Sequence, residues 1–227
     1  MDAIHAAILC DVIGSRRQPD FRRVRDETLE ELSARHLAEG WISFPYAVTA
    51  WDEFQGLTHE IRAVPRVIWS LITTFHPLHL RIGVGIGSVE IDIDRDAPLN
   101  KAATGEAFFR ARNALKISKK GKDHKHEPSS QAETGNRSAD LFLNTTLHLL
   151  DTLVSKATPS QWEVILEYEK LGQQDRVAEK LGKADSTVSR SLRRSNYWQM
   201  IEAVEAMTEF LGMEFPAHQS AISGECT

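Results

Sequence analysis

Residues 177–194 read VAEKLGKADSTVSRSLRR, a pattern of two short helices joined by a tight turn. The first helix keeps its apolar side chains on one face and ends at Gly182, a residue suited to the left-handed conformation of a helix end. In the second helix Val188 and Leu192 are one turn apart and face inward. We expect Asp185 or Ser186 to cap it. The side chains left on its outer face are Ser186, Thr187, Ser189, Arg190, Arg193 and Arg194.

An outer face of short, hydroxylic and basic side chains is typical of a helix that enters the major groove of DNA. A further helix precedes the pair, with Thr158 as its N-cap and Gln161 at the capping-box position. The pattern of residues 178–192 resembles the helix-turn-helix of sigma-factor region 4 and of many bacterial regulators. The resemblance implies a module that binds duplex DNA. The alternative is a helical hairpin that packs only against the rest of the chain or a partner.

The residues before this module alternate between strand and helix patterns. The order β-α-β-β-α-β predicts an α/β fold with a ferredoxin-like layer, followed by an all-α part. Pro65 lies inside one helical pattern, so we expect a kink there or a later start. Strands are expected at residues 4–10, 41–50, 54–57 and 80–93 (one strand or a pair), and helices at 21–38, 59–75, 105–117 and 139–156.

The chain loses almost all of its apolar residues from Gly121 to Ser138, which predicts an exposed, mobile loop. The helix-turn-helix part has its own apolar set, so a fragment starting near Asp151 is expected to fold alone. The expected domains are an α/β domain at 1–138 with a mobile basic loop at 118–138, a connecting helix at 139–157, a helix-turn-helix domain at 158–212 and a flexible tail at 213–227.

Four segments of the chain look like signatures of the SatD family. They are ILCDVIGSR (8–16), AWDEFQGL (50–57), LRIGVGIG (80–87) and AFFRAR (107–112). The resemblance spans nearly the whole chain, because that family also ends in a helix-turn-helix. It implies a fold and a layout rather than a particular activity.

The first part is also similar to the palm-like domain of nucleotidyl and diguanylate cyclases. In those enzymes an Asp at the end of the first strand and acids at a hairpin hold two divalent metals against a nucleoside triphosphate. The likeness implies an Mg²⁺ or Mn²⁺ site at Asp11, Asp52 and Glu53, because both ions prefer carboxylate and phosphate oxygens. If these acids converge, a divalent ion should raise the melting temperature.

The turn after the first strand offers nucleotide contacts at Gly14, Ser15 and Arg16, although Arg16 could instead pair with a nearby acid. The sequence departs from the cyclases just before the hairpin acids. Diguanylate cyclases have two glycines there, whereas this chain has Ala50 and Trp51, and an indole would crowd a phosphate. Three roles therefore stay open for this domain: nucleotide chemistry, sensing of a ligand or metal without turnover, and a structural or dimerising role.

The formal net charge of -5 excludes a uniformly basic nucleic-acid coat, but DNA binding needs only one positive face. Cys10 and Cys226 are too few for a disulfide framework or a zinc site. The start of the chain is a poor signal peptide, and no apolar run approaches the roughly 20 residues that span a bilayer. We therefore expect a cytoplasmic protein with no membrane partner.

The sequence thus predicts a DNA-binding transcriptional regulator whose first domain senses a nucleotide or mediates dimerisation. The alternative is an enzyme, a metal-dependent nucleotidyl cyclase or nucleotidyltransferase tethered to DNA.

Overall fold

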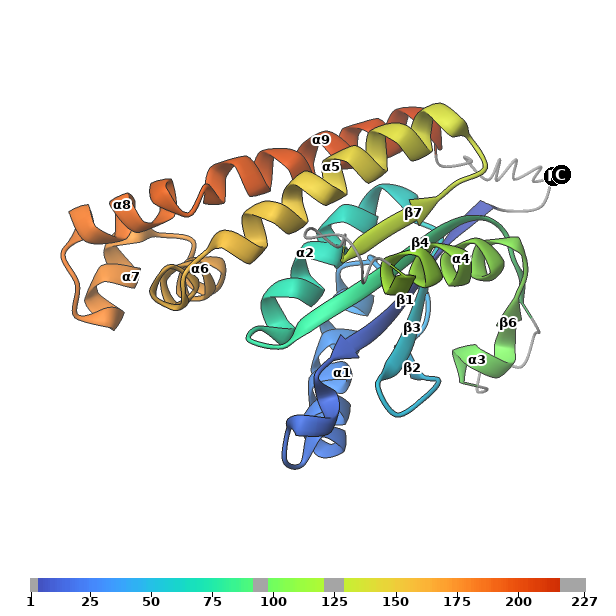
Figure 1. Ribbon diagram of the computed structural model, residues 1–227, viewed down its shortest axis with the longest axis horizontal. Helices are drawn as coiled ribbons and strands as arrows, with labels where there is room; N and C mark the ends of the chain where they lie inside the picture. Colours follow the sequence, from blue (N-terminus) through green and yellow to red (C-terminus); the bar gives the residue numbers. More distant parts are fainter. Residues whose placement is uncertain (1–3, 92–97, 121–128, 217–227) are drawn as a thin grey trace, which may run out of the picture.

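The computed structural model describes residues 4–91, 98–120 and 129–216. It has a mixed α/β fold in which a five-stranded sheet is followed by helices (Figure 1). The α/β class predicted from the sequence is confirmed. No described helix is both long and apolar enough to cross a membrane.

The sheet is built around β1, which lies between β3 and β4 and is antiparallel to both. At one edge β2 pairs antiparallel with β3, and at the other β7 pairs parallel with β4. The strands are β1 (Ile4–Ile13), β2 (Ala47–Val48), β3 (Glu53–Thr58), β4 (His79–Ser88) and β7 (Ser130–Glu133).

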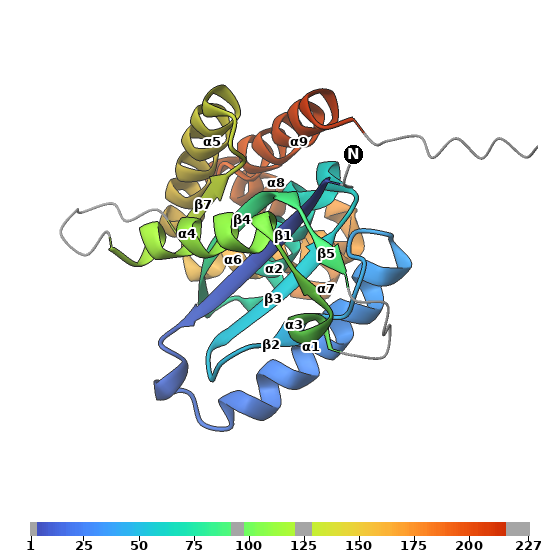
Figure 2. The same ribbon diagram turned by 90° about the vertical axis from the view of Figure 1, so that its right-hand side faces the viewer.

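Alternate residues of β1 point to opposite faces of the sheet. Ile8 and Cys10 belong to the larger apolar core, which includes side chains of α1 (Phe21–Ala38) and α2 (Val64–Phe75). Ala7 and Leu9 belong to a second cluster under α4 (Glu106–Lys120), which crosses the other face (Figure 2). Asp11 follows Leu9 by two residues and therefore lies on the α4 face.

Helix α4 lies unusually close to the sheet because β4 has glycines beneath it. A Cβ on Gly85 would overlap the carbonyl oxygen of Ala107 and the amide nitrogen of Ala111, and Gly83 is equally crowded by α4. The glycines of β4 thus set the position of α4 on the sheet. The remaining short elements are η1 (Ser15–Arg17), η2 (Ile61–Ala63), β5 (Glu90–Ile91), α3 (Leu99–Ala102) and β6 (Ala103–Thr104).

The rest of the described chain is almost entirely helical. Helices α5 and α9 pack side by side and lead away from the sheet, and α6, α7 and α8 gather at the far end (Figure 1). Helix α9 also packs on α2 and η2. The helices are α5 (Arg137–Lys156), α6 (Pro159–Leu171), α7 (Gln174–Leu181), α8 (Asp185–Arg194) and α9 (Tyr197–Glu214).

Aromatic side chains join the two halves of the molecule. The ring of Trp69 on α2 lies 6.4 Å from that of Trp162 on α6 and 6.3 Å from that of Tyr197 on α9, measured between centroids. Val177 and Val188, in the terminal helices, belong to the same buried cluster as the sheet residue Ile8. The helical half therefore shares a continuous apolar core with the sheet.

Several sequence predictions about these elements are confirmed. The first helix spans Phe21–Ala38 as expected, and the second starts late, at Val64, so that Pro65 lies in its first turn. Thr158 and Gln161 form the predicted capping box of α6. Gly182 ends α7 with a φ of 62°.

Other predictions are wrong. The strand expected at 41–50 is reduced to Ala47–Val48. The loop expected at 118–138 contains the end of α4, strand β7 and the start of α5, while residues 121–128 lie outside the described part of the chain. Of the tail expected at 213–227, the first two residues belong to α9, and residues 217–227 are also not described.

Candidate functional sites

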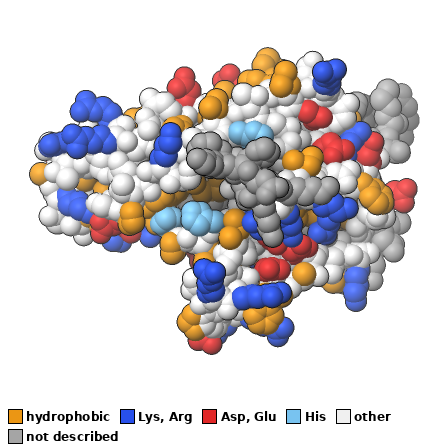
Figure 3. Space-filling view, in the orientation of Figure 1, with side chains coloured by type: hydrophobic (Ala, Val, Ile, Leu, Met, Phe, Trp, Pro, Cys, Tyr) orange, Lys and Arg blue, Asp and Glu red, His pale blue; other side chains and the backbone are white. Residues whose placement is uncertain are grey.

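Helix α8 presents a polar, basic face at the far end of the molecule. Val188 and Leu192 are fully buried, and they fix which side of α8 faces outward. The six outer residues predicted from the sequence are all exposed: Ser186, Thr187, Ser189, Arg190, Arg193 and Arg194. Basic side chains gather at this end of the surface (Figure 3).

The three arginines of α8 have no acidic partner among the described residues. No ion pair found in the described residues includes Arg190, Arg193 or Arg194. By contrast, Lys183 in the preceding turn pairs with Glu163 of α6. The outer face of α8 is therefore available to an anionic partner.

The start of α8 differs from the sequence prediction. The helix begins at Asp185, and Ala184 is its N-cap residue, with no side-chain hydrogen bond. The expected cap at Asp185 or Ser186 is wrong, because both residues already lie inside the helix. Ser186 and Thr187 consequently lie in the first turn of the helix, with their side chains exposed.

A second candidate site lies on the sheet, beneath α4. Asp11 of β1 is directly opposite Glu53 of β3 on one side and Arg81 of β4 on the other. The ammonium group of Lys119, near the end of α4, lies 2.8 Å from Oδ1 of Asp11 and 2.7 Å from Oε1 of Glu53. Arg81 contacts Asp11 at 3.2 Å, and Arg112 contacts Glu53 at 2.8 Å. Two carboxylates are thus held by three cationic side chains.

The pKa values in this cluster reflect the pairing. Burial raises the pKa of Glu53, but hydrogen bonds from Lys119 and Arg112 outweigh it and hold the pKa below its usual value. Burial lowers the pKa of Lys119, but its hydrogen bonds to Asp11 and Glu53 outweigh that and raise the pKa. Both groups are therefore charged at neutral pH, and each of the two carboxylates has cationic partners.

Asp52 and the turn after β1 lie beside this cluster. The Ser15 hydroxyl donates to Oδ2 of Asp52 at 3.5 Å, and the Asp52 carbonyl accepts from the Val12 amide at 2.9 Å. Gly14 has a φ of 76°, which leads the chain into the turn of η1. Arg16 is exposed, and no ion pair of the described residues includes it. Ser15 and Asp52 are thus brought together, whereas Arg16 points to solvent.

The residues do not fit a metal centre in this arrangement. Within residues 4–91, 98–120 and 129–216, no group of three or more His, Cys, Asp or Glu side chains could hold a metal ion. Lys119 lies between Asp11 and Glu53, where a cation shared by the two carboxylates would have to bind.

Trp51 is exposed beside the hairpin, with the guanidinium of Arg22 4.2 Å from its ring centroid.

Sequence reasoning missed the cations of this cluster. The sequence places Lys119 in the basic loop expected at 118–138, and Arg112 in a segment that resembles the SatD family. A usable signal was present, because Arg112 and Lys119 are seven residues apart and so share one face of α4. That face covers the strand ends that carry the acids.

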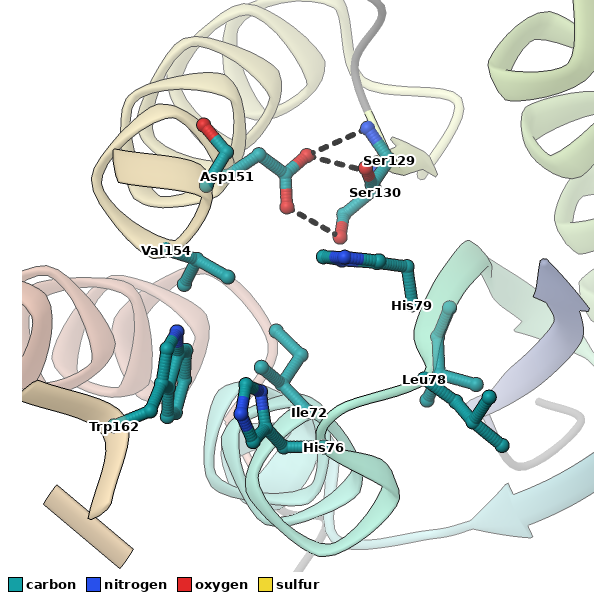
Figure 4. A pocket seen from close by; sticks show the side chains of 11 residues that line it. Ile72, His76, Leu78, His79, Ser129, Ser130, Asp151, Val154 and Trp162 are labelled. Atoms are coloured by element: carbon teal, nitrogen blue, oxygen red, sulfur yellow. Dashed lines mark hydrogen bonds between the residues drawn. The ribbon is translucent and has the colours of Figure 1, made fainter. Parts of the chain in front are cut away.

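A small pocket of about 50 Å³ lies where the two halves of the molecule meet (Figure 4). The Asp151 carboxylate accepts hydrogen bonds from the Ser129 and Ser130 amides, each at 2.8 Å, and from the Ser130 hydroxyl at 3.0 Å. On its other side His76 stacks on Trp162, with ring centroids 4.4 Å apart. The pocket is too small for an organic ligand, and its polar groups mainly hold β7 against α5.

These features define an α/β protein with an ion-paired acidic cluster under α4 and a basic helix at its far end. The SatD family model matches residues 5–209, so the chain belongs to the SatD family. A comparison with curated proteins finds no match.

Proposed function

We propose that the chain is a DNA-binding transcriptional regulator that acts in the cytoplasm, with α7 and α8 as its helix-turn-helix. The observation that carries the proposal is the exposed face of α8, on which Arg190, Arg193 and Arg194 have no acidic partner among the described ion pairs. Guanidinium groups bind phosphate oxygens in a fork-like geometry, so such a face is suited to a DNA backbone.

The shape of the molecule supports the same proposal. Helix α8 lies at the end that is remote from the sheet, where a long duplex can approach without meeting the α/β half (Figure 1). Ser186 and Thr187 occupy the first turn of α8, and the first residues of a recognition helix are those that reach base edges. Their short hydroxylic side chains can serve as donors or acceptors there.

The α/β half is proposed to regulate the DNA-binding half by sensing a nucleotide or by joining two copies of the chain. Strands β1–β4 lie in the order β2-β3-β1-β4 with antiparallel neighbours, which supports the ferredoxin-like layer proposed for this half. This supports the likeness to cyclase palms. The ion pairs of Lys119 with Asp11 and Glu53 favour a role without turnover. A metal-dependent nucleotidyl cyclase or nucleotidyltransferase gains no support from this arrangement.

The proposal is tested with a short fluorescent duplex of arbitrary sequence and fluorescence anisotropy. We expect Arg190→Ala plus Arg193→Ala to weaken binding roughly tenfold near physiological salt, because two phosphate contacts are lost. The matched control is Arg22→Ala plus Arg23→Ala, which removes the same charge from the exposed side of α1. Equal affinities for the two double variants would contradict the proposal.

A further inference from the structure

A groove of about 910 Å³ runs between α1 and α2 on one side and α6 and α9 on the other. Its volume lies in the range of sites that hold small organic molecules, and such sites often form where two parts of a chain meet. The groove is distinct from both the acidic cluster under α4 and the outer face of α8.

One of the residues lining this groove, Trp69, carries a buried hydrogen-bond donor without a partner. Trp69 is only 6% exposed, and its indole N–H has no acceptor among the described residues. Leaving a buried donor unpaired costs about 1–3 kcal/mol, so such groups are uncommon unless another molecule supplies the acceptor. A ligand acceptor that reaches this N–H from the groove would relieve that cost.

Two guanidinium groups lie on the same side of the groove. Arg35 of α1 donates to the hydroxyls of Ser70 at 2.7 Å and Thr74 at 3.3 Å, and Arg66 of α2 is exposed. Neither arginine belongs to an ion pair of the described residues. Together with Trp69 they form a donor-rich wall whose only acid among the groove-lining residues is Glu31, while Glu169 and Glu205 line the opposite wall.

The opposite wall has a different character. Leu166, Ile201 and Val204 give it an apolar surface, flanked by Glu169, Lys170 and Glu205. Glu169 accepts from the Tyr197 hydroxyl at 2.7 Å, and Lys170 pairs with Glu167 at 3.1 Å. Lys170 is thus paired and Glu169 is hydrogen-bonded, and the apolar centre of this wall lies across the groove from the donors of the first wall.

We propose that this groove binds an aromatic organic anion, with its acidic group on Arg35 and Arg66 and its ring system against the apolar wall. A charge-assisted hydrogen bond from a guanidinium fixes the acidic group, and the Trp69 N–H donates to an acceptor on the ligand. Because the walls belong to different halves of the chain, the bound molecule contacts both.

The probe is 8-anilinonaphthalene-1-sulfonate, an aromatic sulfonate whose fluorescence rises on binding. The full chain should bind one molecule, as measured by fluorescence titration and calorimetry. Arg66→Gln and Trp69→Phe should each raise the Kd about tenfold, because each removes one donor to the ligand. Arg62→Gln, an exposed arginine on η2 outside the groove, should leave the Kd unchanged.

Melting temperatures of all variants show that each is folded, and Arg66→Gln tests the site even if Trp69→Phe proves unstable. The proposal is overturned if the wild type does not bind the probe. It is equally overturned if Arg66→Gln binds the probe as tightly as Arg62→Gln does.

Discussion

Lys119 bridges two carboxylates that belong to different strands. Its ammonium group contacts both Asp11 and Glu53, and Arg81 and Arg112 contact the same acids from either side. Two carboxylates this close would otherwise repel each other. The cluster therefore holds its own cation, supplied by the chain.

The sequence predicts that a divalent ion raises the melting temperature, but the ion pairs of Lys119 lead to a different expectation. We expect Mg²⁺ and Mn²⁺ to leave the melting temperature of the wild type unchanged, because Lys119 already lies between the acids. In Lys119→Met the melting temperature without metal should fall, and Mn²⁺ should raise it again by binding the folded state. Differential scanning fluorimetry measures both effects.

The matched control for this experiment is Lys116→Met, which removes a charge from the exposed side of α4. It should give no metal response. A wild type that Mn²⁺ stabilises as strongly as Lys119→Met would show that Lys119 does not occupy a cation site.

Asp151 makes the stability of the folded chain depend on pH. Burial raises its pKa from 3.8 to about 6, although hydrogen bonds from Ser130 and Ser129 oppose the shift. The folded state therefore binds the proton more tightly than the unfolded state. The stability that this group contributes is full below pH 3.8 and is lost as the pH rises through about 6.

We predict that the free energies of unfolding of the wild type and of Asp151→Asn have different pH profiles. As the pH falls from 8 to 4, the free energy of unfolding of the wild type should rise relative to that of the variant by up to about 3 kcal/mol. This is the equivalent of a shift of about two pKa units. Urea unfolding at a series of pH values measures this difference. Parallel profiles would mean that Asp151 does not titrate in this range.

Sequence reasoning found the acids of the sheet cluster but not their partners. A carboxylate at the end of an apolar run is conspicuous, and Asp11 follows Ile8, Leu9 and Cys10. Lys119 is distant in sequence, and its side chain meets Asp11 only because α4 lies on the sheet. Long-range pairing of this kind depends on the packing of whole elements.

At the scale of elements, the close contact between α4 and β4 depends on glycine residues in the strand. Gly83 and Gly85 let the backbone of α4 approach the strand, and Ala107 and Ala111 keep the facing side of the helix small. Glycines usually weaken a strand, because they have no side chain to pack. In the structure they are the surface on which a helix packs.

We predict that Gly85→Ala lowers the free energy of unfolding by about 3 kcal/mol, since the added Cβ would overlap the backbone of α4. Gly212→Ala is the control, because a Cβ there has only one neighbour within 4 Å, at 3.9 Å, and alanine favours a helix. Chemical denaturation of both variants gives the comparison. Similar stabilities for the two would refute the close approach of α4.

Strand β7 shows where element prediction fails. Its residues, Ser130–Glu133, are small or polar and have weak β propensity, so their sequence reads as part of a loop. They become a strand because β4 offers an edge for parallel pairing, and because Asn144 and Asp151 of α5 bind their backbone amides. Most helices, in contrast, were predictable from their apolar spacing and their caps.

At the scale of the whole molecule, the helical half shares its core with the sheet. Helix α9 packs on α2, and the stacked rings of Trp69 and Trp162 link α2 to α6. The sequence suggests that a fragment starting near Asp151 folds alone, but such a fragment would lack α2 with Trp69 and would expose its ring partners Trp162 and Tyr197.

We therefore predict one cooperative thermal transition for the full chain, recorded at the same temperature by near-UV and far-UV circular dichroism. A fragment of residues 151–216 should lose most of its helical signal, because its apolar contacts with α2 are absent. Two separate transitions in the full chain, or a stably helical fragment, would show that the halves fold independently.

The salt dependence of DNA binding tests the role of α8 most directly. Each phosphate contact contributes a slope of about -0.9 to a plot of log affinity against log salt concentration. Loss of Arg190 and Arg193 should therefore make the slope less steep by about 1.8, whereas Arg22→Ala plus Arg23→Ala should leave it at the wild-type value. A wild-type slope in the Arg190→Ala plus Arg193→Ala variant would contradict the assignment of α8 as the DNA-binding helix.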